Sequence, residues 1–163
     1  LTLPSVCMGV KLIGPEKNAA LAAVAKFLDN REGDTIDGET IYNAICFQTR
    51  VTMDDGKYLL LCGDSAYTML KPNLKNMSYI QLPHHGKYEI AEKIFEQKDK
   101  EFGLDVKYYV SDNTGTSNGG SDTLKKKNFG HSVTYTTAGD INVSAHVAAP
   151  KYVPGKSLGV IVR

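Results

Sequence analysis

Two apolar runs decide the fold: Tyr-Leu-Leu-Leu-Cys-Gly-Asp at residues 58–64 and Tyr-Ile-Gln-Leu-Pro-His-His-Gly at residues 79–86. Each run stops abruptly at side chains that can bind a metal ion. Short apolar runs bounded by Gly and Pro are typical of buried strands. We therefore expect two strands, the first ending in the carboxylate of Asp64 and the second in the imidazoles of His84 and His85.

The composition is that of an ordinary globular protein. The 163 residues are 42% hydrophobic and 23% charged, and we predict a single domain over residues 1–163. A formal net charge of +1 gives no electrostatic case for a nucleic-acid or membrane-surface partner. No stretch approaches the ~20 apolar residues of a membrane span. Cys7, Cys46 and Cys62 are spaced too widely for a zinc ribbon or a redox pair, so we expect buried free thiols.

Strand-like and helix-like patterns alternate along the middle of the chain. The Asp-Gly pair at 55–56 predicts a hairpin turn. Polar, glycine-containing stretches predict loops at 29–40 and 111–121. The expected strands are 6–13, 45–53, 58–62, 77–82, 106–110, 132–137, 141–147 and 157–162, and the expected helices are 18–28 (with Asn18 as cap), 65–70, 87–100 and 122–129. This order predicts an α/β fold with a mixed sheet and flanking helices.

Asp64 and the two histidines each allow two interpretations. A buried carboxylate is costly unless it is paired or bound to a cation, but Asp64 could instead cap the helix expected at 65–70. Adjacent strand residues point to opposite faces, so His84 and His85 serve one site only if the chain turns there. Pro83 and Gly86 indicate such a turn. Otherwise one of the two is an ordinary surface or core histidine.

Taken together, the two strand ends predict a metal site. The carboxyl ends of neighbouring strands form the crevice in which open α/β sheets bind ligands. A carboxylate and a neutral imidazole suit zinc or manganese. Such an ion lowers the pKa of bound water and supplies hydroxide near neutral pH. Catalytic zinc uses three protein ligands plus water, so two or three ligands here leave the site incomplete.

Three other features point to less specific roles. His131 follows a helix-ending glycine, so we expect it on the surface. His146 lies in an expected strand, and we interpret it as a partly buried sheet residue. The basic run at 125–127 predicts a solvated helix face.

Leu-Leu-Leu-Cys-Gly-Asp at 59–64, followed by Leu-Pro-His-His-Gly at 82–86, resembles the later motifs of the metallo-β-lactamase fold hydrolases. The most similar branch is the one related to the DNA-uptake protein ComEC, whose strands end in Leu-Thr-Gly-Asp and Val-Pro-His-His-Gly-Ser. Further segments match that branch in order: 10–15, 43–46, 106–112 and 130–141. The resemblance covers most of the chain.

The resemblance implies half of a four-layer αββα sandwich with a dinuclear zinc or manganese site at one sheet edge. Asp64 falls on the metal-bridging aspartate and His85 on the last histidine ligand. His84 becomes a neighbour that contacts substrate or metal, and Asn43 lies at the rim of the substrate site. The branch also carries a histidine in its late polar loop, whereas residues 114–121 have none.

The main ligand motif of the family, His-x-His-x-Asp-His, is absent from the sequence. We therefore expect this chain to be the C-terminal half of such a domain, with a missing N-terminal half, or a partner chain, that carries the other ligands. The first hypothesis is a hydrolase, complete only with that half, that acts on an ester-like bond of a small-molecule or phosphodiester substrate. The second is a non-catalytic half-domain that acts as a binding or assembly module.

Overall fold

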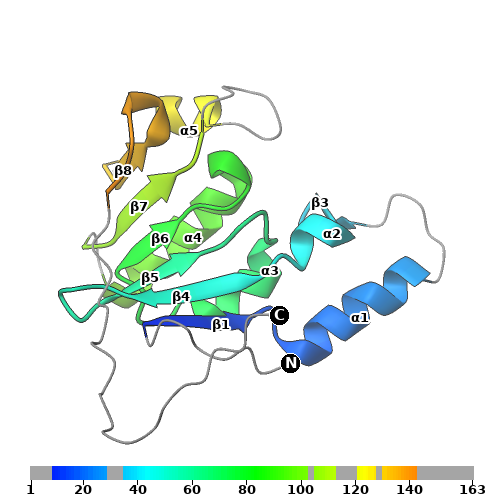
Figure 1. Cartoon of the computed structure of the whole chain (residues 1–163). Helices are drawn as coiled ribbons and strands as arrows, with labels where there is room; N and C mark the ends of the chain where they lie inside the picture. The colour runs from blue at the N-terminus through cyan, green and yellow to red at the C-terminus, as the bar shows by residue number, and fades with distance from the viewer. Residues whose placement is uncertain (1–8, 29–34, 103–104, 113–120, 128–129, 143–163) are drawn as a thin grey trace, which may run out of the picture.

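A computed structural model describes residues 9–28, 35–102, 105–112, 121–127 and 130–142, and all structural statements concern these residues (Figure 1). The strands are β1 (Val10–Gly14), β2 (Thr35–Ile36), β3 (Glu39–Thr40), β4 (Gln48–Thr52), β5 (Tyr58–Leu61), β6 (Tyr79–Gln81), β7 (Lys107–Val110) and β8 (Ser132–Tyr135). The α-helices are α1 (Lys17–Leu28), α2 (Ile41–Ala44), α3 (Tyr67–Leu70), α4 (Tyr88–Phe102) and α5 (Asp122–Lys126), and the 3-10 turns are η1 (Lys71–Asn73), η2 (His84–Gly86) and η4 (Thr136–Ala138).

Six strands form one mixed sheet in the order β1-β4-β5-β6-β7-β8. The first three pair antiparallel, and the hairpin predicted at Asp55-Gly56 joins β4 to β5. From β5 to β8 all pairs are parallel, so these four strands end at the same edge of the sheet. The α/β class and the mixed sheet are thereby confirmed. The sheet also sets the site, because Asp64, His84 and Ser111 each follow one of these strands.

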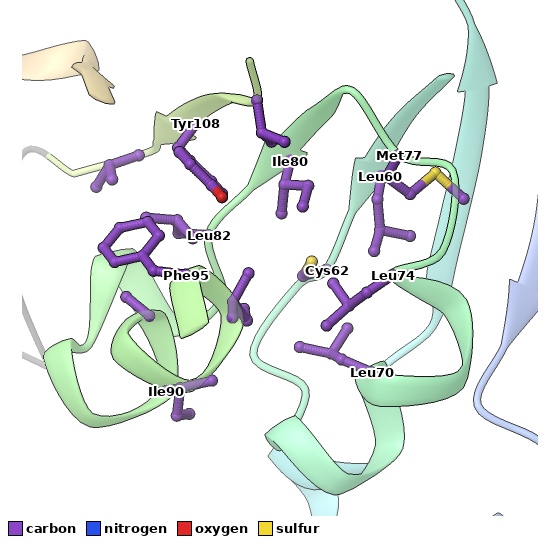
Figure 2. Close-up of a cluster of buried hydrophobic side chains, with 14 of the residues drawn as sticks. Leu60, Cys62, Leu70, Leu74, Met77, Ile80, Leu82, Ile90, Phe95 and Tyr108 are labelled. Carbon is purple, nitrogen blue, oxygen red and sulfur yellow. The ribbon is translucent and has the colours of Figure 1, made fainter. Parts of the chain in front are cut away.

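The main core lies between one face of the sheet and the helices α3, α4 and α5. The side chains buried there from the neighbouring strands β5, β6 and β7 are Leu60, Ile80 and Tyr108. They pack against Ile90 and Phe95 of α4. Figure 2 shows these side chains pointing toward one another between the strands and the helices. Apolar residues recur every three to four positions along α4, which is why its inner face could be predicted from the sequence.

Two expectations within residues 9–44 are wrong. Residues 35–40, expected as loop, form the small β2–β3 hairpin, whose turn residues Asp37 and Gly38 have positive φ. Asp-Gly is itself a hairpin signal, and strands of two residues are too short to show an alternating pattern. The start of α1 is capped by Glu16 and not by Asn18, since its carboxylate accepts hydrogen bonds from two main-chain N–H groups of the first turn.

Several expectations lie outside the described residues: the strand start at 6–8, the polar loop at 113–120, the helix end at 128–129, and the strands at 143–147 and 157–162. Cys7 and His146 fall in the same category. Within the described ranges, no helix has both the length and the apolar character needed to cross a membrane.

Figure 1 shows the β2–β3 hairpin, α2 and α1 together beyond one end of the large sheet. A small cluster joins them there, with Ala23 of α1, Ile41 of α2 and Met69 of α3 buried. The hairpin is attached further by Asp37, whose carboxylate accepts the main-chain N–H of Thr68 at 2.7 Å. These elements lie next to the strand ends that carry the predicted site residues.

Candidate functional site

The ends of β5 and β6 are tied together. The side-chain oxygen of Gln81 accepts the main-chain N–H groups of Cys62 at 2.9 Å and of Gly63 at 3.2 Å. The main-chain N–H of His84 donates to the carbonyl of Gly63 at 3.1 Å. The turn that carries Asp64 and the turn that carries the histidines are therefore adjacent, as the strand-end argument predicted.

Asp64 does not cap the following helix. The residue before α3 is Ala66, which makes no side-chain capping hydrogen bond. The hydroxyl of Ser65 donates instead to the carbonyl of Cys46 at 3.0 Å. The capping interpretation is wrong, and Asp64 stays half-buried at the sheet edge.

Asn43 belongs to α2, which packs beside the Asp64 turn. The main-chain N–H of Ala66 donates to the carbonyl of Ala44 at 3.3 Å. The Cβ that any residue other than glycine would place at position 63 falls 3.2 Å from Cβ of Cys46. Gly63 has φ +55°, so both its backbone and its surroundings require glycine. The segment with Asn43 is thus close to the predicted site, on one side of Asp64.

The two histidines occupy a strained turn. His84 has φ 49° and His85 has φ 55°, in the left-handed region that costs a residue with a side chain about 1–2 kcal/mol. Gly86 follows with φ 79°. The turn predicted from Pro83 and Gly86 is confirmed. Non-glycine residues in such conformations persist only where the surrounding structure holds them, and they cluster at functional sites.

His85 is held by a main-chain oxygen. Its Nδ1 lies 2.6 Å from the carbonyl of Ser111, directly after β7. Because a carbonyl can only accept, Nδ1 carries the hydrogen, and the lone pair of the neutral ring lies on Nε2. This arrangement is common for metal-binding histidines, whose second nitrogen is oriented by a carbonyl or carboxylate.

His84 is held by a buried carboxylate. Its Nδ1 lies 2.6 Å from Oε2 of Glu39, a residue of β3 that is 2% exposed. The other oxygen of Glu39 accepts from Nζ of Lys87, also at 2.6 Å. Glu39 was not predicted from the sequence, because it lies in the stretch expected to be a loop.

The side chains of Asp64, His84 and His85 are the potential metal donors at this edge. The ring centroids of His84 and His85 are 6.3 Å apart and their planes make an angle of 82°. Two imidazoles on one tetrahedral zinc would have centroids about 5 Å apart, from a Zn–N bond of about 2.1 Å. Within the described ranges, no three His, Cys, Asp or Glu side chains cluster closely enough to hold an ion. The spacing of the two rings therefore does not match two imidazoles bound to one tetrahedral ion.

Asp112 was also not predicted as a site residue. It is 1% exposed, and its carboxylate accepts from the main-chain N–H of Ser121 at 3.3 Å and lies 3.6 Å from Nζ of Lys125. The hydroxyl of Ser121 also donates to the carboxylate of Asp112. The hydroxyl of Thr136 donates to the main-chain carbonyl of Asp112 at 3.1 Å. This network fixes the chain next to Ser111, and so fixes the carbonyl that orients His85.

His131, Cys62 and Cys46 differ in their burial and contacts. His131 is not on the surface as expected: its side chain is 8% exposed and its ring stacks on Phe95, with centroids 4.1 Å apart. Its Nε2 lies 3.1 Å from Asp99. Cys62 is buried, as predicted, and burial raises the pKa of its thiol, so it is unreactive. Cys46 is also a free thiol but only half-buried.

Comparison of the chain with protein-family models, with curated proteins and with solved structures gives no match.

Proposed function

We propose that this chain is the metal-bridging half of a metal-dependent hydrolase, with a metal-activated hydroxide attacking an ester-like bond and a phosphodiester as the substrate class. The observation that carries the proposal is the pair of adjoining turns at the ends of β5 and β6. One turn presents Asp64, and the other holds His85 in strained backbone with Nδ1 fixed on Ser111. Strain at consecutive histidines is difficult to explain by packing alone.

In this proposal the residues have separate roles. Asp64 supplies the bridging carboxylate and His85 supplies Nε2 as the last imidazole ligand. Zinc or manganese bound there would lower the pKa of a water molecule and so provide hydroxide near neutral pH. His84 and Asn43 are the proposed groups for contacting substrate. The other ligands, of the His-x-His-x-Asp-His type, come from a segment outside these 163 residues.

The first test uses Mn²⁺ with the isotope-labelled chain, because paramagnetic broadening of amide signals reveals weak binding and locates it. With so few ligands, the expected affinity is low. Broadening should centre on residues 62–65 and 84–86 and should disappear in Asp64→Ala and His85→Ala. His131→Ala is the matched control and should bind as the wild type does. Stoichiometric tight binding, or broadening centred elsewhere, contradicts the proposal.

The second test concerns activity. In a protein that contains this chain together with the His-x-His-x-Asp-His ligands, Asp64→Ala should abolish hydrolysis of a simple phosphodiester and leave the fold intact. Wild-type turnover in that variant excludes the bridging role.

A second candidate, a non-catalytic binding or assembly half-domain, is favoured by the sheet face opposite α3 and α4. Val10, Leu12 and Leu61 lie on that face and are 41%, 50% and 38% exposed. Exposed aliphatic residues on adjacent strands suit a protein contact. Under this candidate, Mn²⁺ leaves the Asp64 and His85 signals unchanged, whereas charge substitutions at Leu12 or Leu61 prevent association with the complementary half.

A further inference from the structure

The carboxylate of Glu39 is almost fully buried although it lies in a two-residue strand at the margin of the fold. A buried carboxylate is strongly unfavourable unless charged or hydrogen-bonding partners compensate for the lost water. Both of its partners, His84 and Lys87, come from the turn that follows β6, more than 40 positions along the chain. The burial of Glu39 is therefore a specific link between the β2–β3 hairpin and the histidine turn.

The two oxygens of Glu39 are divided between different tasks. Oε1 accepts a hydrogen bond from the ammonium group of Lys87 at 2.6 Å, and the positive charge of Lys87 balances the negative charge of Glu39. Oε2 lies 2.6 Å from Nδ1 of His84. Because a carboxylate only accepts, Nδ1 must carry the hydrogen. The neutral ring of His84 is then the tautomer with its lone pair on Nε2.

The hairpin that carries Glu39 is itself fixed in place. Asp37, in its turn, accepts the main-chain N–H of Thr68 at 2.7 Å and lies 3.4 Å from Nζ of Lys93. Asp37 therefore contacts α3 and α4, and Glu39 contacts the histidine turn. Because Asp37 holds the hairpin against α3 and α4, Glu39 can hold the imidazole of His84 in one orientation, even though His84 has a left-handed backbone.

We propose that Glu39 is a positioning residue that fixes the tautomer and orientation of His84, making Nε2 the hydrogen-bond acceptor of the ring. Lys87 stabilises this arrangement because its ammonium group balances the negative charge of Glu39. What His84 then contacts rests on the proposed function: Nε2 accepts a hydrogen bond from a water or hydroxyl group of the substrate reaction. The tautomer itself does not depend on any metal or substrate. Glu39–His84 and Ser111–His85 are thus two separate supports for two neighbouring rings.

The test is long-range ¹H–¹⁵N correlation of the histidine rings in the metal-free chain at mildly alkaline pH. The wild type should show His84 protonated at Nδ1 and unprotonated at Nε2. In Glu39→Leu, which removes the acceptor, the ring nitrogen shifts of His84 should move toward a mixture of tautomers. His85 is the internal control, since its support is the carbonyl of Ser111, and its signals should not move.

Two further variants keep the test decisive. Glu39→Gln retains an acceptor oxygen, so it should keep more of the Nδ1–H tautomer than Glu39→Leu does, and it serves if the leucine variant does not fold. Lys87→Met leaves Glu39 in place and should preserve the tautomer. A wild-type His84 protonated at Nε2, or a tautomer indifferent to both Glu39 variants, overturns the proposal.

The two proposals fail in different ways. If Mn²⁺ does not broaden the signals around Asp64 and His85 while the Glu39 variants still change the tautomer of His84, the metal function is wrong and the positioning role stands. If Mn²⁺ binds as expected while His84 is protonated at Nε2, the positioning role is wrong and the metal function stands. Glu39→Gln should in addition leave the Mn²⁺ broadening at His85 unchanged.

Discussion

Nδ1 of His85 lies 2.6 Å from the main-chain oxygen of Ser111, and this contact connects the end of β6 to the end of β7. The two strands are parallel neighbours, so the chain delivers a side chain and a carbonyl to the same edge of the sheet. The contact determines which ring nitrogen of His85 can bind a ligand. It also accounts for the ordering of a left-handed residue that local backbone preference would not favour.

The strain at His85 can be separated from the loss of its imidazole by two substitutions. His85→Ala and His85→Gly both remove the ring and its bond to Ser111, but only alanine has a Cβ that opposes φ 55°. We expect His85→Gly to be the more stable of the two by about 1 kcal/mol. Urea unfolding measures the difference. An alanine variant of equal or greater stability would show that position 85 is not left-handed in solution.

Gly63 should be intolerant of any side chain. Gly63→Ala requires a left-handed alanine whose Cβ lies 3.2 Å from Cβ of Cys46, so we expect a loss of about 2–3 kcal/mol in the free energy of unfolding. Gly56→Ala is the control. Gly56 has φ +78° but open space around its Cβ position, and its loss should be about 1 kcal/mol. Equal losses in the two variants would mean that the contact with Cys46 carries no energy.

Tyr79 and Asp55 provide a test at the opposite end of the sheet. The hydroxyl of Tyr79 donates to the carboxylate of Asp55 at 2.6 Å, which raises the pKa of Tyr79 to about 12. The neutral phenol is favoured in the folded state, so this contribution to stability is present below pH 10 and is lost as the pH rises through about 12.

Asp55→Asn should lower the pKa of Tyr79 toward its ordinary value, as followed by phenolate absorbance after subtraction of the spectrum of Tyr79→Phe. Asp54→Asn is the matched control, because Asp54 is the exposed neighbour and takes no part in this hydrogen bond. If the two asparagine variants titrate alike, the raised pKa has another cause.

Structural features set by a short turn motif or by a regular spacing of apolar residues could be predicted from the sequence. The hairpin at Asp55-Gly56 and the amphipathic helix α4 were predicted because a short turn motif or a helical repeat determines each. The adjacency of Asp64 and His84 followed from two apolar runs ending in polar groups. Each of these features is encoded within a few consecutive residues or in a regular spacing.

The supports of the site could not be predicted in this way. Glu39 meets His84 across 45 positions, and Ser111 meets His85 across 26. Both contacts depend on which strands become neighbours, and a main-chain carbonyl has no sequence signal at all. Asp37-Gly38 was the one available sign of the hairpin that carries Glu39. The burial of His131 likewise depends on Phe95, a helix residue distant in sequence.

Lys98 gives the clearest pH dependence. Its side chain is fully buried, with Nζ donating to the carbonyl of Leu74 at 3.0 Å and lying 3.5 Å from the carboxylate of Glu101. Burial lowers the pKa of Lys98 below its ordinary value of 10.5, and the charge of Glu101 only partly opposes this. In the interval between the lowered folded value and 10.5, the unfolded chain holds more protons than the folded chain. Stability therefore rises with pH across that interval, and the cost of the buried charge is complete below it.

The change is isolated by comparing the wild type with Lys98→Met in denaturant unfolding at a series of pH values. The difference between the two free energies should be constant at neutral pH and should shift in favour of the wild type as the pH approaches 10.5. Lys100→Met, which removes an exposed lysine of the same helix, is the matched control for the loss of one positive charge. Tyrosines with a raised pKa lose their contribution to stability as the pH rises further, so the effect of Lys98 is taken from the difference between the two unfolding free energies. A flat curve for Lys98→Met would mean that the ammonium group reaches water in solution.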